Sequence, residues 1–303
     1  MDPEDTSVID IQREQIEKLS ANLPVGAVLV GRYKVQGVLG RGGMGVVYRG
    51  IDLKRGTTVA IKVLLMDTVN HIMLDRMAAE AAILVFLRHP NLVAVHDMGT
   101  DPVSHIHYAV MEYAPHGSLG ELIESHGALD VEQTAAVGLQ LCCALDLLHH
   151  RGILHRDIKP TNLLRAQDGR VLLTDLGISK IPDASFEETD ADQIMGSFPY
   201  MAPEQRLGMD SVTPQSDLYA VGTTLFKLCT GTSPMDIFAH PIGHPRWARV
   251  PEALRPVLRW ATAFDANDRP HSARQLGGAL SELVSPELFE RQPHLEEWLL
   301  DRP

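Results

Sequence analysis

The chain has 303 residues, 45% of them hydrophobic and 22% charged, which is enough for two lobes with buried cores and gives no sign of wholesale disorder. Its net charge of −12 argues against nucleic acid or an anionic membrane as the main partner, because phosphate groups would be repelled. Three cysteines without a CxxC pair argue against a disulfide framework or a zinc site, and the acidic N-terminus is unlike a signal peptide. We therefore expect a cytoplasmic protein without a membrane span.

The N-terminal extension, residues 1–30, places Ile9, Ile16 and Leu19 near helical spacing among charged neighbours. This pattern predicts a short amphipathic helix that ends around Pro24. Its apolar stripe either packs on the back of the first lobe or forms a docking or dimerisation element for a regulatory partner.

From Tyr33 onward the pattern changes to short runs rich in β-branched residues, separated by glycine and polar turns. Together with one helix expected at about 72–88, these runs predict a small antiparallel sheet within a first lobe of residues 31–113. The expected strands are residues 33–39, 46–49, 59–63, 93–98 and 107–113.

After Gly117 the apolar periodicity is mostly helical, which predicts an α-rich second lobe over residues 114–284 and a C-terminal tail over 285–303. The fold class is therefore α+β, with two lobes. The expected helices are residues 119–123, 134–149, 217–230, 253–263 and 273–284.

A glycine-rich segment, residues 40–47, reads Gly-Arg-Gly-Gly-Met-Gly-Val-Val and contains the spacing GxGxxGxV. In a dinucleotide-binding unit such glycines open a helix, but here a strand-like run follows, which indicates a strand–glycine–strand hairpin. Glycine lets the backbone approach a triphosphate closely because no Cβ intervenes. An ordinary hairpin turn is the alternative interpretation of this segment alone.

Lys62 ends the run Val-Ala-Ile-Lys, on an expected strand with apolar neighbours where an ammonium group needs a partner. Glu80 is the natural partner, because helical spacing places it with Met77, Leu84 and Leu87 on the side of the next helix that faces the sheet. The alternative is a lysine that snorkels at a sheet edge.

Residues 155–162 read His-Arg-Asp-Ile-Lys-Pro-Thr-Asn and gather four side-chain chemistries just after an expected helix that ends near His150. A surface loop would not need His, Asp, Lys and Asn together. Asp175 follows a strand-like run, residues 170–174, and provides a second carboxylate. Because magnesium prefers oxygen ligands from carboxylates and substrate phosphates, Asn162 and Asp175 are candidate metal ligands.

In chain order, GxGxxGxV, VAIK, a helical Glu, HRDxKPxN, DxG and APE resemble the motif set of the protein kinase superfamily over roughly residues 31–284. The amino-acid sequences of residues 39–45 and 201–205 are similar to those of the bacterial branch of Ser/Thr kinases. The resemblance implies a two-lobed kinase fold and transfer of the γ-phosphoryl group of ATP to Ser or Thr hydroxyls of proteins, including its own. In that family Lys159, two positions after the loop aspartate, accompanies Ser/Thr specificity.

Carried over residue by residue, the resemblance implies that Asp157 accepts the substrate proton and that Lys159 neutralises charge on the transferring phosphoryl group. Asn162 and Asp175 would coordinate magnesium, or manganese in its place. Catalysis is then mainly positioning and electrostatics, without a covalent enzyme intermediate.

The resemblance also assigns the nucleotide contacts. Lys62, paired with Glu80, would hold the α- and β-phosphates. The glycine loop would cover the triphosphate with Leu39, Gly40, Gly42, Gly43 and Gly45. The adenine would be held by Val47, Ala60, Leu164 and the backbone of Glu112 and Ala114, with Met111 as gatekeeper.

Three further residues take structural roles by the same resemblance. Glu204 would form a buried pair with Arg269, and Asp217 would anchor the catalytic loop from below. Breaking such a buried pair leaves an uncompensated charge, so we expect inactivity through misfolding rather than lost chemistry.

The chain departs from the family pattern in the segment between the metal site and Glu204. Leu176 stands where phenylalanine is commonest, and Ser197 replaces the usual Thr while it keeps a hydroxyl that can reach Asp157 and Lys159. We hypothesise that the carboxylates of residues 183–192 partly replace a phosphate in ordering this segment against Arg156, although a solvated acidic loop is the alternative.

The segment 232–250 is rich in proline and histidine and is shorter than its family counterpart. An irregular loop is the expectation, with metal binding by His240 and His244 as the alternative. Two rival functions stay open for the whole chain: a pseudokinase that binds ATP without turnover, and a small-molecule kinase that shares the ATP lobe.

Overall fold

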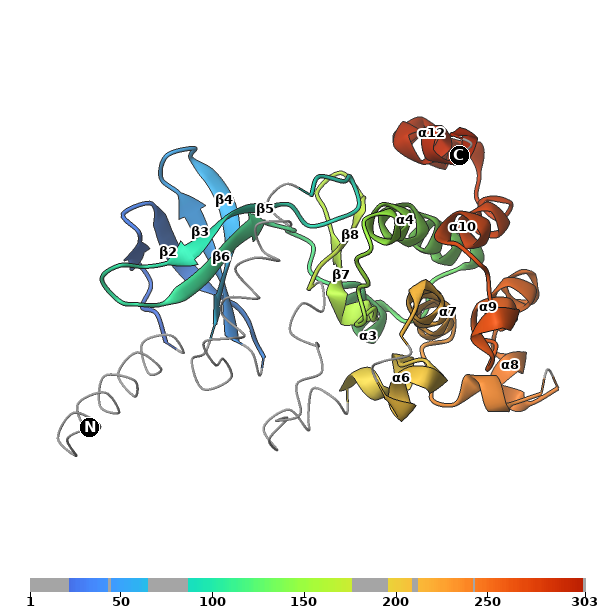
Figure 1. Ribbon diagram of the computed structural model, residues 1–303. Coiled ribbons are helices and arrows are strands. Elements are labelled where there is room, and N and C mark those ends of the chain that lie inside the picture. Colours follow the sequence, from blue (N-terminus) through green and yellow to red (C-terminus); the bar gives the residue numbers. More distant parts are fainter. Residues whose placement is uncertain are drawn as a thin grey trace, which may run out of the picture. The chain divides into compact units, whose positions relative to one another are not determined.

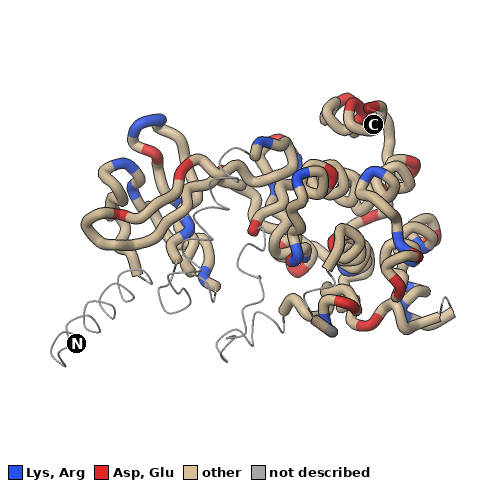
Figure 2. Tube along the Cα trace, in the orientation of Figure 1, with Lys and Arg blue, Asp and Glu red and all other residues tan. Residues whose placement is uncertain are grey.

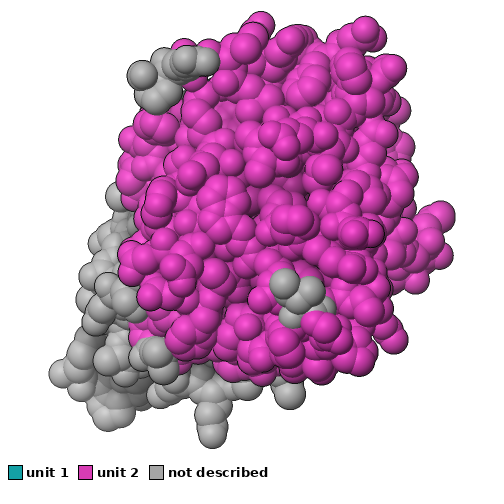
Figure 3. Space-filling view, turned by 90° about the vertical axis from the view of Figure 1, so that its right-hand side faces the viewer, with its two compact units in different colours: residues 1–88, 93–113 teal, residues 89–92, 114–303 magenta. Residues whose placement is uncertain are grey.

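The computed structural model describes residues 22–42, 45–64, 87–175, 196–208, 212–241 and 243–301 (Figure 1). The chain divides into two compact units, here called the first unit (Met1–Arg88 with Val93–Tyr113) and the second unit (His89–Leu92 with Ala114–Pro303). One face of the second unit is shown in Figure 3. Lys and Arg are interspersed with Asp and Glu along the described chain of both units (Figure 2).

The described part of the first unit forms a six-stranded antiparallel sheet in the order β1-β2-β3-β4-β6-β5. Alternate residues of its strands enter one core, where Val59, Ile61 and Val63 are at most 2% exposed. The five predicted strands are confirmed, whereas the helix expected at about 72–88 lies almost entirely outside the described residues. The strands are β1 (Val28–Leu29), β2 (Tyr33–Gly42), β3 (Gly45–Asp52), β4 (Thr57–Leu64), β5 (Val95–Thr100) and β6 (His107–Glu112).

Hydrogen bonds tie the β1 end of this sheet to the β5 end. Val30, just after β1, donates its N–H to Asp101 Oδ2 at 2.6 Å, and Asp101 follows β5. The Tyr33 hydroxyl of β2 donates to Asp97 Oδ2 of β5 at 2.5 Å. The sheet therefore curls until its two outermost strands are linked.

Over its described residues the second unit is helical apart from one hairpin of β7 (Leu163–Arg165) and β8 (Val171–Leu173). The five predicted helices are confirmed, with shifted ends. The α-helices are α3 (Leu119–His126), α4 (Val131–His150), α6 (Pro203–Leu207), α7 (Pro214–Thr230), α8 (Pro245–Ala248), α9 (Arg255–Ala261), α10 (Ala273–Ser281), α11 (Pro286–Arg291) and α12 (Pro293–Leu300). The 3-10 helices are η2 (Pro160–Asn162), η4 (Phe198–Tyr200), η6 (Ile237–Ala239), η7 (Glu252–Leu254) and η8 (Ala266–Asp268).

Helix α4 is the core of the second unit, packed against α7, α10 and β8 (Figure 1). It begins with a capping box in which Asp130 accepts from Gln133 N at 2.8 Å and Gln133 accepts from Asp130 N at 3.2 Å. Among the described residues, α4 is the helix that is long and apolar enough to cross a membrane. However, 72% of its apolar stretch is buried inside the protein itself. An apolar sequence on all sides is what a central core helix needs.

The segment expected as a tail begins at residue 285, and its described residues, 285–301, contain helices α11 and α12 of the second unit. Proline stands at the first position of both helices, where its missing N–H costs no helical bond. Leu288 and Leu295 then enter a core cluster with Leu139 and Cys143 of α4. The apolar residues of this segment therefore pack against the core of the unit.

Candidate active site

The glycine-rich segment forms the predicted hairpin between β2 and β3, with Gly40 opposite Val47 and Gly42 opposite Gly45. Gly43 and Met44 lie outside the described residues. Gly45 is required by close packing, because a Cβ on it would come within 2.1 Å of Val63 O on β4. The hairpin is therefore fixed to its neighbouring strand at the base of the turn.

Four residues predicted to contact the nucleotide share one face of the first unit's sheet. Val47 is opposite Lys62 in the register of β3 with β4, and Ala60 is opposite Met111 in the register of β4 with β6. The alternating residues Val59, Ile61 and Val63 point into the core, so these four side chains lie on the other face. Glu80 lies outside the described residues, and its pairing with Lys62 stays a prediction.

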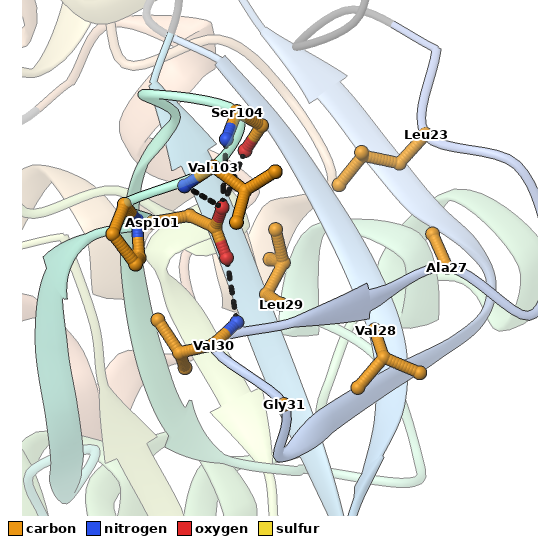
Figure 4. A pocket seen from close by; sticks show the side chains of 10 residues that line it. Leu23, Ala27, Val28, Leu29, Val30, Gly31, Asp101, Val103 and Ser104 are labelled. Atoms are coloured by element: carbon orange, nitrogen blue, oxygen red, sulfur yellow. Dashed lines mark hydrogen bonds between the residues drawn. The ribbon is translucent and has the colours of Figure 1, made fainter.

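A hollow of about 350 Å³ in the first unit is lined by β1 and by the loop after β5 (Figure 4). The carboxylate of Asp101, which lines this hollow, already has hydrogen-bond donors from neighbouring residues. Asp101 Oδ1 accepts from the backbone N–H groups of Val103 at 3.0 Å and of Ser104 at 2.8 Å. Burial by itself would raise the pKa of Asp101, but the hydrogen bonds from Ser104 and Val30 lower it. None of the residues predicted to contact the nucleotide lines this hollow, so we assign it no part in the site.

In the second unit, the loop that contains Asp157 is held by hydrogen bonds to one buried carboxylate. Asp217 of α7 is 1% exposed and accepts from His155 N at 2.9 Å and from Arg156 N at 2.8 Å. His149 Nε2, at the end of α4, lies 2.8 Å from the same side chain. The predicted anchoring by Asp217 is confirmed, and His149 is an additional partner that sequence reasoning missed.

His155 is fully buried and joins the loop to the end of β8. Its Nδ1 accepts from Asp157 N at 3.3 Å, so its Nε2, 3.0 Å from Thr174 O, must carry the proton and donate. Burial lowers the pKa of His155, which keeps the ring neutral in this arrangement.

The Asp157 carboxylate is fixed by two donors. Lys159 Nζ lies 3.0 Å from Asp157 Oδ2, and Asn162 Nδ2 donates to the same oxygen at 3.1 Å. Lys159 Nζ also donates to the Ser197 hydroxyl at 2.7 Å, which agrees with the predicted reach of Ser197. A carboxylate, an ammonium group and a hydroxyl therefore meet on one side of the loop.

Asn162 and Asp175 lie at the same end of the β7–β8 hairpin. Leu163 is paired with Leu173, and Thr174 N donates to Asn162 O at 3.0 Å, which places Asp175 one residue further. The amide nitrogen of Asn162 bonds to Asp157, so its Oδ1 is turned away from that residue.

An amide oxygen and an exposed carboxylate form a donor set that fits a hard divalent cation. In the described ranges, no cluster of three or more His, Cys, Asp or Glu side chains offers an alternative metal centre. His240 and His244, considered as ligands, instead stack on each other with ring centroids 4.0 Å apart.

The predicted pair of Glu204 and Arg269 is confirmed as a two-pronged ion pair. Arg269 is 1% exposed, and its two terminal nitrogens donate to the two Glu204 oxygens at 2.7 and 2.8 Å. Burial alone would raise the pKa of Glu204, but the hydrogen bonds from Arg269 and Ser216 lower it. The carboxyl is therefore held ionised.

Several predictions fall on residues outside the described ranges and stay predictions. They concern the N-terminal helix, Leu176 and the acidic segment 183–192. Leu164 and Ala114, expected near adenine, are both partly exposed residues of the second unit.

Comparison with known proteins gives a consistent result. The protein kinase domain family matches residues 33–276. The probable serine/threonine-protein kinase PknB of Bifidobacterium longum is 36% identical over 225 residues, which cover 71% of this chain and 32% of that protein. The serine/threonine-protein kinase PknA of Mycobacterium tuberculosis is 36% identical over 279 residues, which cover 89% of this chain and 64% of that protein.

Among solved structures, the PknI kinase domain of Mycobacterium tuberculosis is similar with a TM-score of 0.68 and 29% identity, covering 87% of this chain and 100% of that one. The chain spans less than two thirds of the length of either curated relative.

Proposed function

The chain belongs to the protein kinase family, and on that premise we propose that it is a Ser/Thr protein kinase that transfers the γ-phosphoryl group of ATP to protein hydroxyls, including its own. One observation carries the proposal. The carboxylate of Asp157, the ammonium group of Lys159 and the hydroxyl of Ser197 meet within hydrogen-bond distance, beside Asn162.

In this proposal the substrate hydroxyl lies beside Asp157 and gives its proton to that carboxylate as its oxygen attacks the γ-phosphorus. The new O–P bond forms while the bond from the γ-phosphorus to the bridging oxygen breaks, and ADP leaves with that oxygen. Lys159 already bonds to Asp157 and lies where it can offset charge on the moving phosphoryl group.

The family uses ATP with a divalent metal ion, and we propose magnesium, with manganese able to substitute. When bound, the cation would neutralise phosphate charge. Asn162 Oδ1 and the Asp175 carboxylate would hold it, because both are oxygen donors at one end of the β7–β8 hairpin.

We assign the nucleotide itself to the shared face of Val47, Ala60, Lys62 and Met111 in the first unit. The N–H of Glu112 donates to Ala94 O at 2.8 Å, so a bond from Glu112 to adenine would use its carbonyl oxygen. Lys62 would contact the α- and β-phosphates.

The test is transfer of labelled phosphate from ATP with magnesium to a panel of proteins. We expect Asp157→Asn to lose 10²- to 10⁴-fold in rate, because the proton acceptor is removed. Asp265→Asn, the same change at a cap of η8, is the control and should keep the wild-type rate. Phosphoamino acid analysis should give phosphoserine or phosphothreonine.

The rival functions give different results in the same assay. A pseudokinase would bind ATP but show no transfer in the wild-type chain, so neither substitution would have a rate to change. A small-molecule kinase would label a metabolite and no protein, although the Glu204–Arg269 pair and Asp217 are features of protein-substrate enzymes. Phosphotyrosine as the product would contradict the Ser/Thr assignment.

Two further proposals concern the setting of the enzyme. The cytoplasm suits the chain, because Cys142, Cys143 and Cys229 are buried thiols outside any disulfide. The helix predicted near the N-terminus would carry a dimer or partner contact through Ile9, Ile16 and Leu19. Sedimentation of wild type against Leu19→Asp tests this contact, since loss of a dimer in the variant alone would support it.

A further inference from the structure

Residues 89–92 belong to the second unit although they precede β5, and they extend the β7–β8 hairpin. Leu173 N donates to Asn91 O at 2.9 Å, and Leu92 forms a parallel bridge with Leu173. Asn91 Nδ2 also donates to Val171 O at 3.0 Å. We name residues 89–92 the connector; it contacts β8 through both backbone and side chain.

The orientation of the Asn91 amide follows from its partners. Its nitrogen donates to the Val171 carbonyl, which can only accept, and to Gln140 Oε1 at 2.9 Å. Its oxygen must therefore be the atom that faces His294 Nε2, 2.8 Å away on α12, and His294 is the donor. Asn91 is 1% exposed, so a missing donor would leave a buried oxygen unsatisfied.

Helix α12 is itself held firmly. Leu295 is fully buried against α4, and Trp298 Nε1 donates to Asp146 Oδ2 of α4 at 2.8 Å. Arg274 of α10 donates to the same oxygen at 3.0 Å and lies over the Trp298 ring at 5.1 Å. His294 therefore presents its donor from a fixed position.

On the other side, β8 leads directly to the candidate metal ligand. Thr174 follows β8, with its N–H on Asn162 O and its carbonyl on His155 Nε2, and Asp175 comes next. A continuous series of contacts thus runs from α12 through the connector and β8 to Asp175. The kinase family match ends at residue 276, so α11 and α12 lie beyond it.

We propose that His294 is a positioning residue that fixes the connector on β8, so that the C-terminal helices hold Asp175 in place for the metal. The inference rests on the proposed function for its kinetic consequence. The structural part of the inference, that His294 orders β8, does not depend on the proposed function.

The experiment uses the full chain as wild type, His294→Ala, His294→Gln and Glu296→Ala. Glu296 is an exposed residue on the same helix and is the matched control. Hydrogen exchange of the Val171 and Leu173 amides is measured first. We expect His294→Ala to speed exchange about tenfold, because one buried hydrogen bond is lost, and Gln, which keeps an N–H donor, to restore most of the protection.

The kinetic arm measures KM for magnesium and kcat. We expect His294→Ala to raise the KM several-fold with a smaller change in kcat, again with rescue by Gln. Unchanged exchange in β8, or equal effects from His294→Ala and Glu296→Ala, would overturn the proposal. If the wild-type chain transfers no phosphate, the proposed function fails, and the exchange data still decide whether His294 orders β8.

Discussion

The loop that carries Asp157 is surrounded by buried hydrogen-bonding groups, whereas the β2 side of the glycine hairpin in the first unit is exposed over its last five residues. Asp217 and His155 hold the loop from within the second unit. In the hairpin, Val38 and Leu39 are 49% and 45% exposed, and every residue from Gly40 to Gly42 is exposed.

The difference fits the roles that we propose for the two regions. Groups that stabilise a transition state work best when they are fixed before the reaction, because reorganisation then costs little. A cover over a nucleotide must admit and release its ligand, so it can have few fixed contacts. Substitutions should therefore affect stability and kcat in the second unit and nucleotide affinity in the first.

The largest expected effect comes from breaking the second unit's buried ion pair. Arg269→Ala leaves the Glu204 carboxylate without its main partner and should lower the free energy of unfolding by about 3–5 kcal/mol. Urea unfolding measures this. Arg259→Ala is the control, because Arg259 stacks on Trp247 and bonds to a carbonyl. If both variants lost the same free energy of unfolding, the Glu204–Arg269 ion pair would contribute no more than an ordinary arginine contact.

Acid should weaken the same unit. Burial lowers the pKa of His89 from 6.5 to about 4. Arg170, and His294 once it is protonated, add to the shift, while Asp146 opposes it. Between pH 6.5 and pH 4 the unfolded chain therefore binds more protons than the folded chain. The free energy of unfolding that depends on neutral His89 is fully present above pH 6.5 and is lost as the pH falls towards 4. The loss is on the order of 3 kcal/mol.

Urea unfolding at several pH values checks this, with His89→Gln as the comparison. The variant should be less stable near pH 7 but should have a flatter pH dependence. The same slope in both proteins would assign the acid sensitivity to other groups.

A smaller effect is expected at the base of the glycine hairpin. Gly45→Ala forces a Cβ against Val63 O, so β3 must shift from β4 at a cost of about 1–3 kcal/mol. We expect a higher KM for ATP with a smaller change in kcat. Gly37→Ala on β2 is the control, because a Cβ there has open space. A loss confined to kcat would contradict the division of roles between the two regions.

The smallest effect concerns the Ser197 hydroxyl. Ser197→Ala removes an acceptor of the Lys159 ammonium and should lower kcat roughly tenfold, whereas Ser197→Thr keeps the hydroxyl and most of the rate. Steady-state kinetics with one protein substrate measures both variants. Equal rates for Ala and Thr would mean that the Lys159 contact is not used during transfer.

The sequence predicts structure well where neighbouring residues along the chain form the structural element. The β-branched run Val59–Val63 predicted β4, whereas the side of the sheet on which Lys62 lies became clear only from the strand register. The Glu204–Arg269 pair came from the family resemblance, since no local pattern links residues 65 apart.

The contacts of α12 could not be predicted in this way. His294 and Asn91 are 203 residues apart, and each is an ordinary polar residue in its own segment. Their meeting depends on how α4, α10 and β8 pack together. The prolines at positions 286 and 293 were a readable signal that two helices begin there, but not of which surface they would cover.

The bond from Val30 to Asp101 has a consequence for the behaviour of the protein at high concentration. An open sheet offers unpaired backbone groups on its outer strands, and these are the usual template for pairing with a second molecule. Here the outer strand on one side has two residues, and the chain just beyond it is bonded to the chain beyond the opposite side. The two linked ends are thereby withdrawn from pairing with a second molecule, and Asp101→Ala should make the first unit more prone to aggregate.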